Sequence, residues 1–536
     1  MIIAAARRPV LFRHLRFLMA CVDVAAALIV LNAAAPAHAD GNVRIGLSVL
    51  RDRVRGALAG QMAGVTFGDP TEFEWRGTIG DGDLTWSPDR IKGALDQDDL
   101  YVEMTFAGVM DKFGLDASTE QYGEAFRNSR YELWHANAAA RRNLNNGIKA
   151  PMSGHPKYNM HANDIDFQIE ADFIGLMTPG MPQVAVELCD RVGHVMNYGD
   201  GVYGGMFIAG MYCAAYFETD VRKVVEAGLA CLPEGSGYRA AIADVICAHD
   251  KNPGDWKECW RAINERWDRD ESCPEGAFRT FDIDARLNGA YVAIGLLYGA
   301  GDFDKTIEIA TRCGQDSDCN PSSAAGVLGA MYGYGALDKK WVGYIPTLAD
   351  EKFSFTDYSF NSFVDSTVRR AREAVKRSGG KVRFGHLLIP RRAVTPPKLE
   401  QWSMGIPLKV YAYDDPAWKW VGEWEERTYH GYIEPASKIS YKEGNEATLE
   451  FEGNAVAVVG LIQQRYGGMM DVYLDGKKVD RVNAYVALNT TDKDLWHTYG
   501  LGDGPHTLRL VTVDEKDPRA KGQWIRIECA EAFHSK

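Results

Sequence analysis

The hydrophobic pattern of this chain changes period once, and that change divides the chain into two kinds of fold. From about residue 44 to residue 374, apolar residues recur three and four positions apart. This spacing gathers apolar side chains on one face of a helix. The clearest such segments are Leu100–Phe113, Pro182–Val195, Gly204–Phe217, Tyr238–Ala248 and Ala290–Tyr298. Strands do not alternate with them, so the first part is predicted to be an all-α domain without a parallel nucleotide-binding sheet.

Beyond residue 400 the period becomes two. Short alternating runs occur at Thr448–Val459, Met470–Leu474, Thr507–Val513 and Trp524–Glu528, and Asp475-Gly476 is typical of a hairpin turn. Between the two parts, Ser-Gly-Gly, Arg-Arg and Pro-Pro interrupt any periodicity, as in a connector. The chain is therefore predicted to be multidomain: residues 1–39 a signal peptide, 40–375 a helical domain, 376–400 a linker, and 401–536 an all-β, jelly-roll-like sandwich.

Tryptophan is concentrated in the predicted sandwich. Core packing is the simpler explanation, because tryptophan fills cores more often than it stacks on ligands. Stacking of one or two exposed rings on sugars is the alternative, and it would make the sandwich a carbohydrate-binding module. The residues concerned are Trp402, Trp418, Trp420, Trp424, Trp496 and Trp524.

Charge and the first residues indicate the partners and the compartment. The net charge of −13 argues against a nucleic-acid partner, which would require a basic face. Residues 1–39 combine four arginines with an apolar stretch and a small-residue cleavage site, Ala37-His38-Ala39. We therefore expect a secreted or periplasmic protein without a stable membrane span in its mature form. A membrane anchor is the alternative, although Asp23 interrupts the apolar stretch.

The cysteines do not form a regular framework. Nine of the ten follow the signal segment, at irregular spacing and without a Cys-x-x-Cys pair. One or two local disulfides are compatible with this spacing in an oxidising compartment. Zinc catalysis is not expected, because the sequence shows no local zinc motif.

Acidic residues precede two of the predicted helices. Gln97-Asp98-Asp99 stands directly before the apolar run from Leu100, and Asp316-Ser-Asp318-Cys319-Asn320-Pro321 precedes a run of small residues. Helix capping explains part of both patterns. It does not explain two further carboxylates upstream of the Asn320-Pro321 cap. Aspartates two residues apart in a turn present hard oxygen donors to one point, which suits Mg²⁺, Mn²⁺ or Ca²⁺.

These motifs together resemble the ADP-ribosylglycohydrolase family. Arg55–Phe73 is similar to its opening helix and loop, Gln97-Asp98-Asp99 to its Thr-Asp-Asp, and Asp316–Asn320 to its Asp-Thr-Asp-Thr/Cys-Asn. Asp172-Phe-Ile-Gly and the run His194–Met206 also take part in the resemblance. It covers roughly residues 45 to 350. It implies an ADP-ribosylglycohydrolase-like all-α fold that binds one or two divalent ions and hydrolyses a bond to the anomeric carbon of a ribofuranose.

The resemblance also implies site residues. It makes Glu72 and Asp99 the catalytic carboxylates. The implied ions are Mg²⁺ or, as alternatives, Ca²⁺ or Mn²⁺. Their implied ligands are Gln97, Asp98, Asp99, Asp316, Asp318 and Cys319. Gln97 and Cys319 replace hydroxyl residues of the family pattern. Instead of binding a metal ion, Cys319 could form a disulfide with Cys313. Val65 stands where many members have aspartate. The expected substrate-binding residues are Asp172, His194, Asn197, Asp200 and Tyr203, with a core position as the alternative for His194.

Three functions are compatible with these features. The favoured hypothesis is a secreted, metal-dependent glycoside hydrolase acting on a furanosidic or related bond of an extracellular glycan. The second is removal of ADP-ribose from protein or from small ribosyl-containing conjugates. The third is a non-catalytic glycan-binding protein whose metal site has decayed, suggested by Gln97, Cys319 and Val65.

Overall fold

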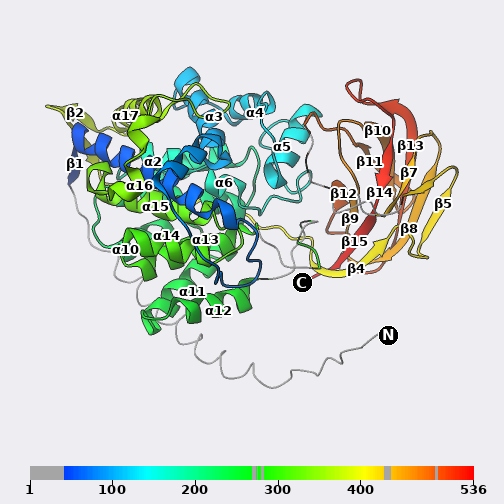
Figure 1. Cartoon of the computed structure of the whole chain (residues 1–536). Helices are drawn as coiled ribbons and strands as arrows, with labels where there is room; N and C mark the ends of the chain where they lie inside the picture. The colour runs from blue at the N-terminus through cyan, green and yellow to red at the C-terminus, as the bar shows by residue number, and fades with distance from the viewer. Residues whose placement is uncertain are drawn as a thin grey trace.

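A computed structural model describes residues 41–268, 273, 276–278, 283–427, 436–488, 490 and 493–536. The predicted signal peptide, residues 1–39, lies outside these residues. The described chain forms a helical body with a β-sandwich beside it (Figure 1). No helix in the described ranges is long and apolar enough to cross a bilayer.

The helical body confirms the all-α prediction. Its longest helices are α2 (Leu47–Gly68), α17 (Phe360–Arg377), α3 (Asp98–Phe113) and α9 (Asp200–Ala215). The other helices of the body are α4 (Thr119–Arg127), α5 (His135–Asn145), α6 (Asp166–Ile169), α7 (Asp172–Met177), α8 (Pro182–Gly193), α10 (Val221–Leu229), α11 (Gly237–Lys251), α12 (Trp256–Trp267), α13 (Ala285–Gly299), α14 (Phe303–Arg312), α15 (Cys319–Tyr332) and α16 (Lys339–Val342), with 3₁₀ turns η1 (Asp69–Thr71), η2 (Pro88–Asp96), η3 (Tyr334–Ala336) and η4 (Ile345–Thr347).

Helices α2 and α15 pack backbone against backbone at the centre of the body. A Cβ atom added at Gly60 would lie 2.2 Å from the carbonyl oxygen of Ala325, and one added at Gly64 would lie 2.2 Å from that of Pro321. The glycines spaced four apart in α2 are therefore required by this contact. Because α15 begins at Cys319, the contact also fixes the turn that carries Asp316 and Asp318.

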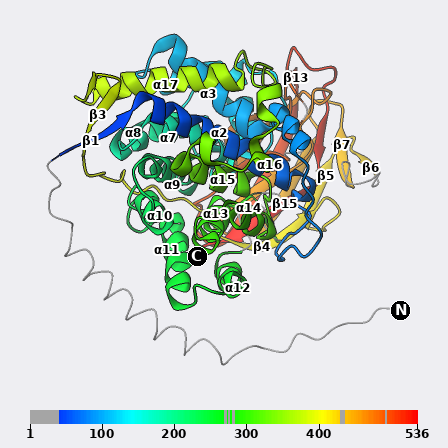
Figure 2. The same cartoon turned by 60° about the vertical axis from the view of Figure 1, so that its left-hand side comes forward.

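Part of the predicted linker, residues 376–400, belongs to a small sheet. Strand β3 (His386–Pro390) pairs antiparallel with both β2 (Lys381–Arg383) and β1 (Asn42–Gly46). Leu387 and Ile389 of β3 are buried in the helical core. The two ends of the helical domain are thereby joined, and the segment between the domains begins only after Pro390. Figure 2 shows α17, which leads into this sheet, running across one end of the body.

The C-terminal part is an antiparallel sandwich, as predicted. One sheet has the order β11-β10-β13-β8-β5, a second has the order β12-β9-β15-β4, and β14-β7-β6 forms a third. Buried residues of the two larger sheets share one core. The strands are β4 (Ile406–Ala412), β5 (Trp418–Val421), β6 (Glu425–Arg427), β7 (Ser437–Ser440), β8 (Glu446–Glu452), β9 (Ala455–Val459), β10 (Gly468–Leu474), β11 (Lys477–Asn483), β12 (Asp494–Thr498), β13 (Pro505–Lys516), β14 (Ile525–Ile527) and β15 (Cys529–His534).

Two strand predictions had different outcomes. Asp475 and Gly476 both have positive φ, 49° and 79°, and they form the β10–β11 turn as predicted. The single run Thr448–Val459 is instead two strands, β8 and β9, which belong to different sheets. Gly453, with φ of 146°, lies at the corner where the chain passes between the sheets.

The tryptophans of the sandwich all contact other parts of the protein. Trp420 lies between two other tryptophan rings, with centroids 5.2 Å and 4.8 Å away. Trp402 donates a hydrogen bond to Asn163 of the helical body, and Trp496 donates one to Asp480. For Trp402, Trp418, Trp420, Trp424 and Trp496, these contacts agree with the core-packing explanation.

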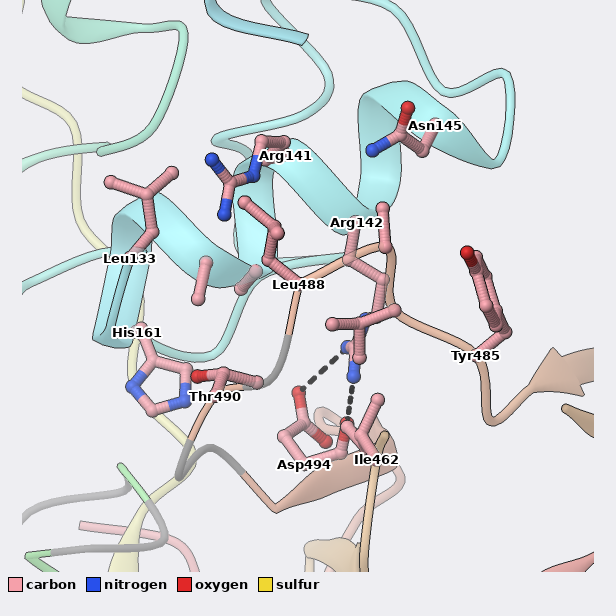
Figure 3. Close-up of a pocket in the computed structure, with 14 residues that line it drawn as sticks. Leu133, Arg141, Arg142, Asn145, His161, Ile462, Tyr485, Leu488, Thr490 and Asp494 are labelled. Atoms are coloured by element: carbon pink, nitrogen blue, oxygen red, sulfur yellow. Dashed lines mark hydrogen bonds and ion pairs between the residues drawn. The ribbon is translucent and has the colours of Figure 1, made fainter. Parts of the chain in front are cut away.

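The sandwich is docked on the helical body through polar contacts around α5. The Arg142 guanidinium donates a hydrogen bond to the backbone carbonyl of Asp494 at 2.5 Å and lies 3.8 Å from its carboxylate (Figure 3). Nearby, the ring of buried His497 donates to the carbonyl of Pro156 at 2.6 Å. The sandwich is therefore positioned relative to the helical domain by specific hydrogen bonds.

Candidate metal centre and active-site pocket

The two acidic segments meet in a pocket of about 700 Å³. Asp98 begins α3, and Asp316 and Asp318 lie in the turn before α15. Glu72, which follows η1, completes the acidic wall. Residues that are far apart in sequence therefore converge at the starts of two helices, as the metal-site prediction requires.

Two groups of ligand atoms lie in or beside this pocket. Asp99, Asp318 and Cys319 form one group, and Glu72, Asp316 and Asp318 form the other. Within each group the ligand atoms all lie within 4.8 Å of one another. Asp318 belongs to both groups, so its carboxylate would be a ligand common to ions held by either group.

The buried oxygens of these groups fit a cation. Asp99, Asp316 and Asp318 are each at most 3% exposed, yet the Oδ1 atom of each has no hydrogen-bond partner among the described residues. A buried carboxylate oxygen without a partner is costly, and a metal ion would compensate it. Hard oxygen donors of this kind suit Mg²⁺, Mn²⁺ or Ca²⁺.

The acid–base properties of the pocket indicate the same need for positive charge. Burial, followed by the charge of Asp318, raises the pKa of Asp98 from 3.8 to about 6. Burial and the neighbouring carboxylates raise the pKa of Asp99 well above its ordinary value. Burial and the charge of Asp318 do the same for Asp316. Without a cation these carboxylates oppose one another's ionisation.

Gln97 and Cys319, the two departures from the family pattern, have different surroundings. The side-chain amide of Gln97 donates to Asp69 Oδ1 at 2.7 Å, and Gln97 lines the pocket. The Cys319 thiol donates to Asp99 Oδ2 at 3.3 Å. Cys313 and Cys319 are both free thiols, so the alternative disulfide is not formed. Cys319 therefore stays beside the metal groups as a hydrogen-bond donor.

A further layer of buried carboxylates lies behind the metal groups. Asp172 accepts a hydrogen bond from the Tyr212 hydroxyl at 2.5 Å, and burial raises its pKa to about 7. Glu103, one helical turn after Asp99, accepts from the backbone N–H of Phe173 at 2.8 Å. Asp172 thus supports the site from behind and does not line the pocket. The sequence signal for Glu103 was its spacing of four from Asp99 on α3.

His194 and Tyr203, predicted to bind substrate, do not line this pocket. The His194 Nε2–H donates to Glu400 at 3.1 Å, and its Nδ1–H donates to the carbonyl of Asp190. The Tyr203 hydroxyl accepts from the backbone N–H of Glu400 at 2.7 Å. Both residues hold the segment that enters the sandwich, so their position favours a structural role.

Asn197 and Asp200 are also structural in position. The Asn197 amide donates to the carbonyls of Ala162 and Asp164, and its oxygen accepts from the N–H of Phe167. Asp200 begins α9 and accepts from the N–H of Tyr238 at 3.0 Å. Asn197 therefore holds the loop of residues 162–167 and does not line the pocket. Asp200 connects the start of α9 to the start of α11.

The pocket has walls that sequence reasoning missed. Phe73, Tyr101 and Trp134 present aromatic rings, and Arg76 supplies a cation. Leu461, Thr490 and Lys493 come from the sandwich, so both domains border the pocket. The remaining unpredicted residues of interest are His135, Asn137 and Asp166 at the start of α5 and α6. Nothing in the local sequence around these positions distinguishes them from ordinary surface or core residues.

The helical domain thus carries a pocket lined by carboxylates at two helix starts. The ADP-ribosylglycohydrolase family model matches residues 47–369, which is more than half of the chain. The chain therefore belongs to the ADP-ribosylglycohydrolase family, a family of glycosyl-hydrolase-type enzymes. No curated protein matches the sequence significantly.

Solved structures give low-identity matches to the chain. An ADP-ribosylglycohydrolase-related protein complex matches at 15% identity and a TM-score of 0.42, covering 61% of this chain and 99% of that chain. A family 35 carbohydrate-binding module from Clostridium thermocellum matches at 13% identity and a TM-score of 0.18, over 24% and 98%. The CBM36-1 domain of a xylanase from the hindgut metagenome of Trinervitermes trinervoides matches at 11% identity and a TM-score of 0.17, over 23% and 94%.

Proposed function

We propose that the chain is an exported, metal-dependent glycoside hydrolase that cleaves a furanosidic or related bond of an extracellular glycan. The observation that carries this proposal is the charge of the pocket. Six carboxylates line it, and the cations Arg76 and Lys493 oppose them. Two divalent ions together with Arg76 and Lys493 would balance the six negative charges and leave no surplus positive charge to attract a diphosphate. A neutral sugar is therefore the better complement. The carboxylates are Glu72, Asp96, Asp98, Asp166, Asp316 and Asp318.

The shape and lining of the pocket support a sugar ligand. A volume of about 700 Å³ lies in the range of small-molecule sites. The rings of Phe73, Tyr101 and Trp134 offer apolar faces on which a sugar can lie. Because residues of both domains surround the cavity, a terminal sugar unit enters it more readily than the middle of a rigid chain.

Named residues have distinct roles in this proposal. Asp98, Asp99, Asp316 and Asp318 would hold the ions. Bound divalent ions would polarise water and orient vicinal sugar hydroxyls. Glu72 is exposed and belongs to the same group as Asp316 and Asp318, so its carboxyl oxygen is placed to accept and return a proton at the sugar. Asp172 and Glu103 hold the backbone and side chains behind the ligands.

Hydrolysis of an ADP-ribosyl bond is the second candidate, and family membership favours it. In that case Arg76 and Lys493 would have to pair with the diphosphate. A non-catalytic glycan-binding protein is disfavoured, because Asp99, Asp316 and Asp318 are grouped as candidate ligands and Asp98 lines the same pocket. Divalent-metal content of the purified protein separates this third hypothesis from the first two.

A substrate screen tests the proposal. The purified protein would be assayed against aryl furanosides, aryl pyranosides and ADP-ribosyl conjugates, each with Mg²⁺ or Mn²⁺ and with EDTA. We expect metal-dependent release from a furanoside or related glycoside. Activity confined to ADP-ribosyl conjugates would replace the glycan proposal with the second candidate. Absence of turnover together with absence of bound metal would support the third.

A further inference from the structure

A second cluster of metal-ligating side chains lies outside the acidic metal groups. His135, His161 and Asp164 offer ligand atoms within 4.8 Å of one another. His161 and Asp164 are buried, with side chains 0% and 1% exposed. His135 lines the acidic pocket, whereas His161 lines the cavity between the domains (Figure 3). The cluster thus lies where the start of α5 separates the two cavities.

Cys273 adds a sulfur ligand to this cluster. Its Sγ atom lies 3.2 Å from His161 Nδ1 and 3.8 Å from Asp164 Oδ2. His161 Nδ1 and Asp164 Oδ2 are 2.9 Å apart. Around a tetrahedral zinc ion, neighbouring N, O and S ligands are separated by roughly 3.3–3.6 Å. The three observed distances bracket this spacing.

The arrangement does not match a hydrogen-bonded Cys-His-Asp triad. In such a triad the two ring nitrogens serve different partners. Here the thiol and the carboxylate both approach the same nitrogen, Nδ1 of His161. The thiol also lies 3.8 Å from Asp164 Oδ2, so the nitrogen, the oxygen and the sulfur all contact one another. Convergence of three donor atoms on one point is typical of a metal site.

The backbone of His135 gives independent support. His135 has φ of 49°, in the left-handed region that a non-glycine residue adopts at an energetic cost. The rings of His135, the first residue of α5, and His161 have centroids 6.0 Å apart. Ligation of the His135 imidazole by a bound ion would offset this conformational cost.

We propose that His135, His161, Asp164 and Cys273 form a structural zinc site. Two imidazoles, one carboxylate and one thiolate are the donors that Zn²⁺ prefers, in contrast to the oxygen-rich metal groups of the pocket. With these four ligands bound, the coordination sphere would be closed, so the ion would hold structure and leave no open position for catalysis. Cys273 binds as thiolate and releases its proton to solvent when the ion enters.

The site would fix the junction between the domains. It ties the first residue of α5 to the loop that carries Asp164 and Asp166. Two turns further along α5, Arg142 bonds Asp494 of the sandwich. The same ion would therefore hold one wall of the acidic pocket and the helix on which the sandwich is docked.

Metal analysis and cobalt spectroscopy of the full chain test this proposal. We expect about one zinc ion per chain to survive dialysis against Mg²⁺. Co²⁺ exchanged into the site should give the intense visible bands of tetrahedral geometry and a sulfur-to-cobalt charge-transfer band. Cys273→Ser should abolish the charge-transfer band and lower zinc content severalfold. His161→Gln should lower zinc content similarly.

Matched variants distinguish the site from the rest of the protein. Cys247→Ser, at a half-buried thiol on α11, should retain zinc and the cobalt bands. Asp316→Asn should retain them too, while losing ions from the acidic groups. Circular dichroism shows whether each variant is folded. The proposal is overturned if the folded wild-type protein binds no zinc, or if Cys273→Ser keeps both its zinc and the charge-transfer band.

Discussion

Asp316 and Asp318 each lower the stability of the metal-free protein and also serve the proposed function. Burial raises the pKa of both carboxyl groups, and the charge of Asp318 raises that of Asp316 further, so their ionised forms are unfavourable unless a cation is bound. We predict that Asp316→Asn stabilises the metal-free protein by about 1–3 kcal/mol, because one buried charge is removed. The same change should lower kcat/KM by more than about 100-fold, and Asp98→Ala should do likewise, because each removes a proposed metal ligand.

Thermal unfolding in EDTA and in Mn²⁺ measures the first effect, and turnover measures the second. Asp365→Asn, which removes an exposed carboxylate paired with Arg51, is the control and should change neither quantity. An Asp316→Asn variant that is less stable than the wild type in EDTA would contradict the account of uncompensated charge.

The individual residues that sequence patterns predict well are those in local motifs. Asp98, Asp99, Asp316 and Asp318 stand next to recognisable helix starts. Asp99, Asp316 and Asp318 belong to the two ligand groups, and Asp98 lies in the wall of the same pocket. The family resemblance predicts His194 as a substrate-binding residue, but in the structure His194 bonds to Glu400, which is 206 positions away in sequence. A local pattern cannot reveal such a partner, so the structural role of His194 required coordinates.

Among the elements, the contact between α2 and α15 positions the acidic turn. We predict that Gly64→Ala lowers stability by about 1–3 kcal/mol, because the added Cβ overlaps the Pro321 carbonyl and forces α15 outwards. Metal affinity should fall as well, since α15 follows directly from Asp318. Gly108→Ala on α3 is the matched control, because nothing lies within 4 Å of its added Cβ.

Urea denaturation and metal titration check both changes. Gly108→Ala should be neutral or stabilise the protein by about 0.4–1 kcal/mol, as expected for a helical glycine in open space. Equal effects of the two substitutions would show that the close helix contact is not what positions the acidic turn.

The segment between the domains is held by the His194–Glu400 pair, which gives a pH prediction. Burial alone would lower the pKa of His194, but its bonds to Glu400 outweigh burial and raise it above 6.5. Burial alone would raise the pKa of Glu400, but His194 lowers it below 4.5. The pair therefore stabilises fully between about pH 4.5 and pH 6.5. Its contribution is lost as pH rises through the pKa of His194 or falls through that of Glu400.

Glu400→Gln should lower the free energy of unfolding by about 1–2 kcal/mol inside this window and by less outside it. Urea denaturation of the wild type and the variant at about pH 3, pH 5.5 and pH 9 measures the difference. A difference that does not vary with pH would contradict an ionic pair.

Element types were easier to predict from sequence than element partners. The period of three to four predicted the helices, because helical amphipathicity is a local property. The division of Thr448–Val459 into β8 and β9 was missed, because both strands are apolar and the corner at Gly453 depends on which sheet each strand joins. The sequence predicts a linker where β2 and β3 lie. Strand β3 pairs with β1, which begins more than 300 residues earlier, so a local pattern does not reveal this sheet.

At the scale of the whole molecule, the sandwich forms part of the pocket wall. Leu461, Thr490 and Lys493 line the acidic pocket. We therefore predict that a chain shortened to end at Gln401 loses activity on a polymer and on a small soluble glycoside together. Binding of the polymer by a separate module would instead reduce only the polymer rate, through lost effective concentration.

Comparison of kcat/KM for both substrates decides between these roles. Lys493→Ala in the full chain, with Lys419→Ala on the exposed edge strand β5 as control, repeats the test without removing a domain. An unchanged rate on the small glycoside in both the shortened chain and Lys493→Ala would contradict a shared pocket.

The central claim is that the carboxylate pocket hydrolyses a glycosidic bond with bound divalent ions. The most direct measurement is turnover of the best substrate from the screen before EDTA, after EDTA and after Mn²⁺ is restored, for wild type and Asp318→Asn. The account predicts that wild-type activity disappears and returns, and that the variant, which lacks the carboxylate common to both metal groups, is inactive throughout. Full wild-type activity in EDTA, or full activity of Asp318→Asn, would contradict it.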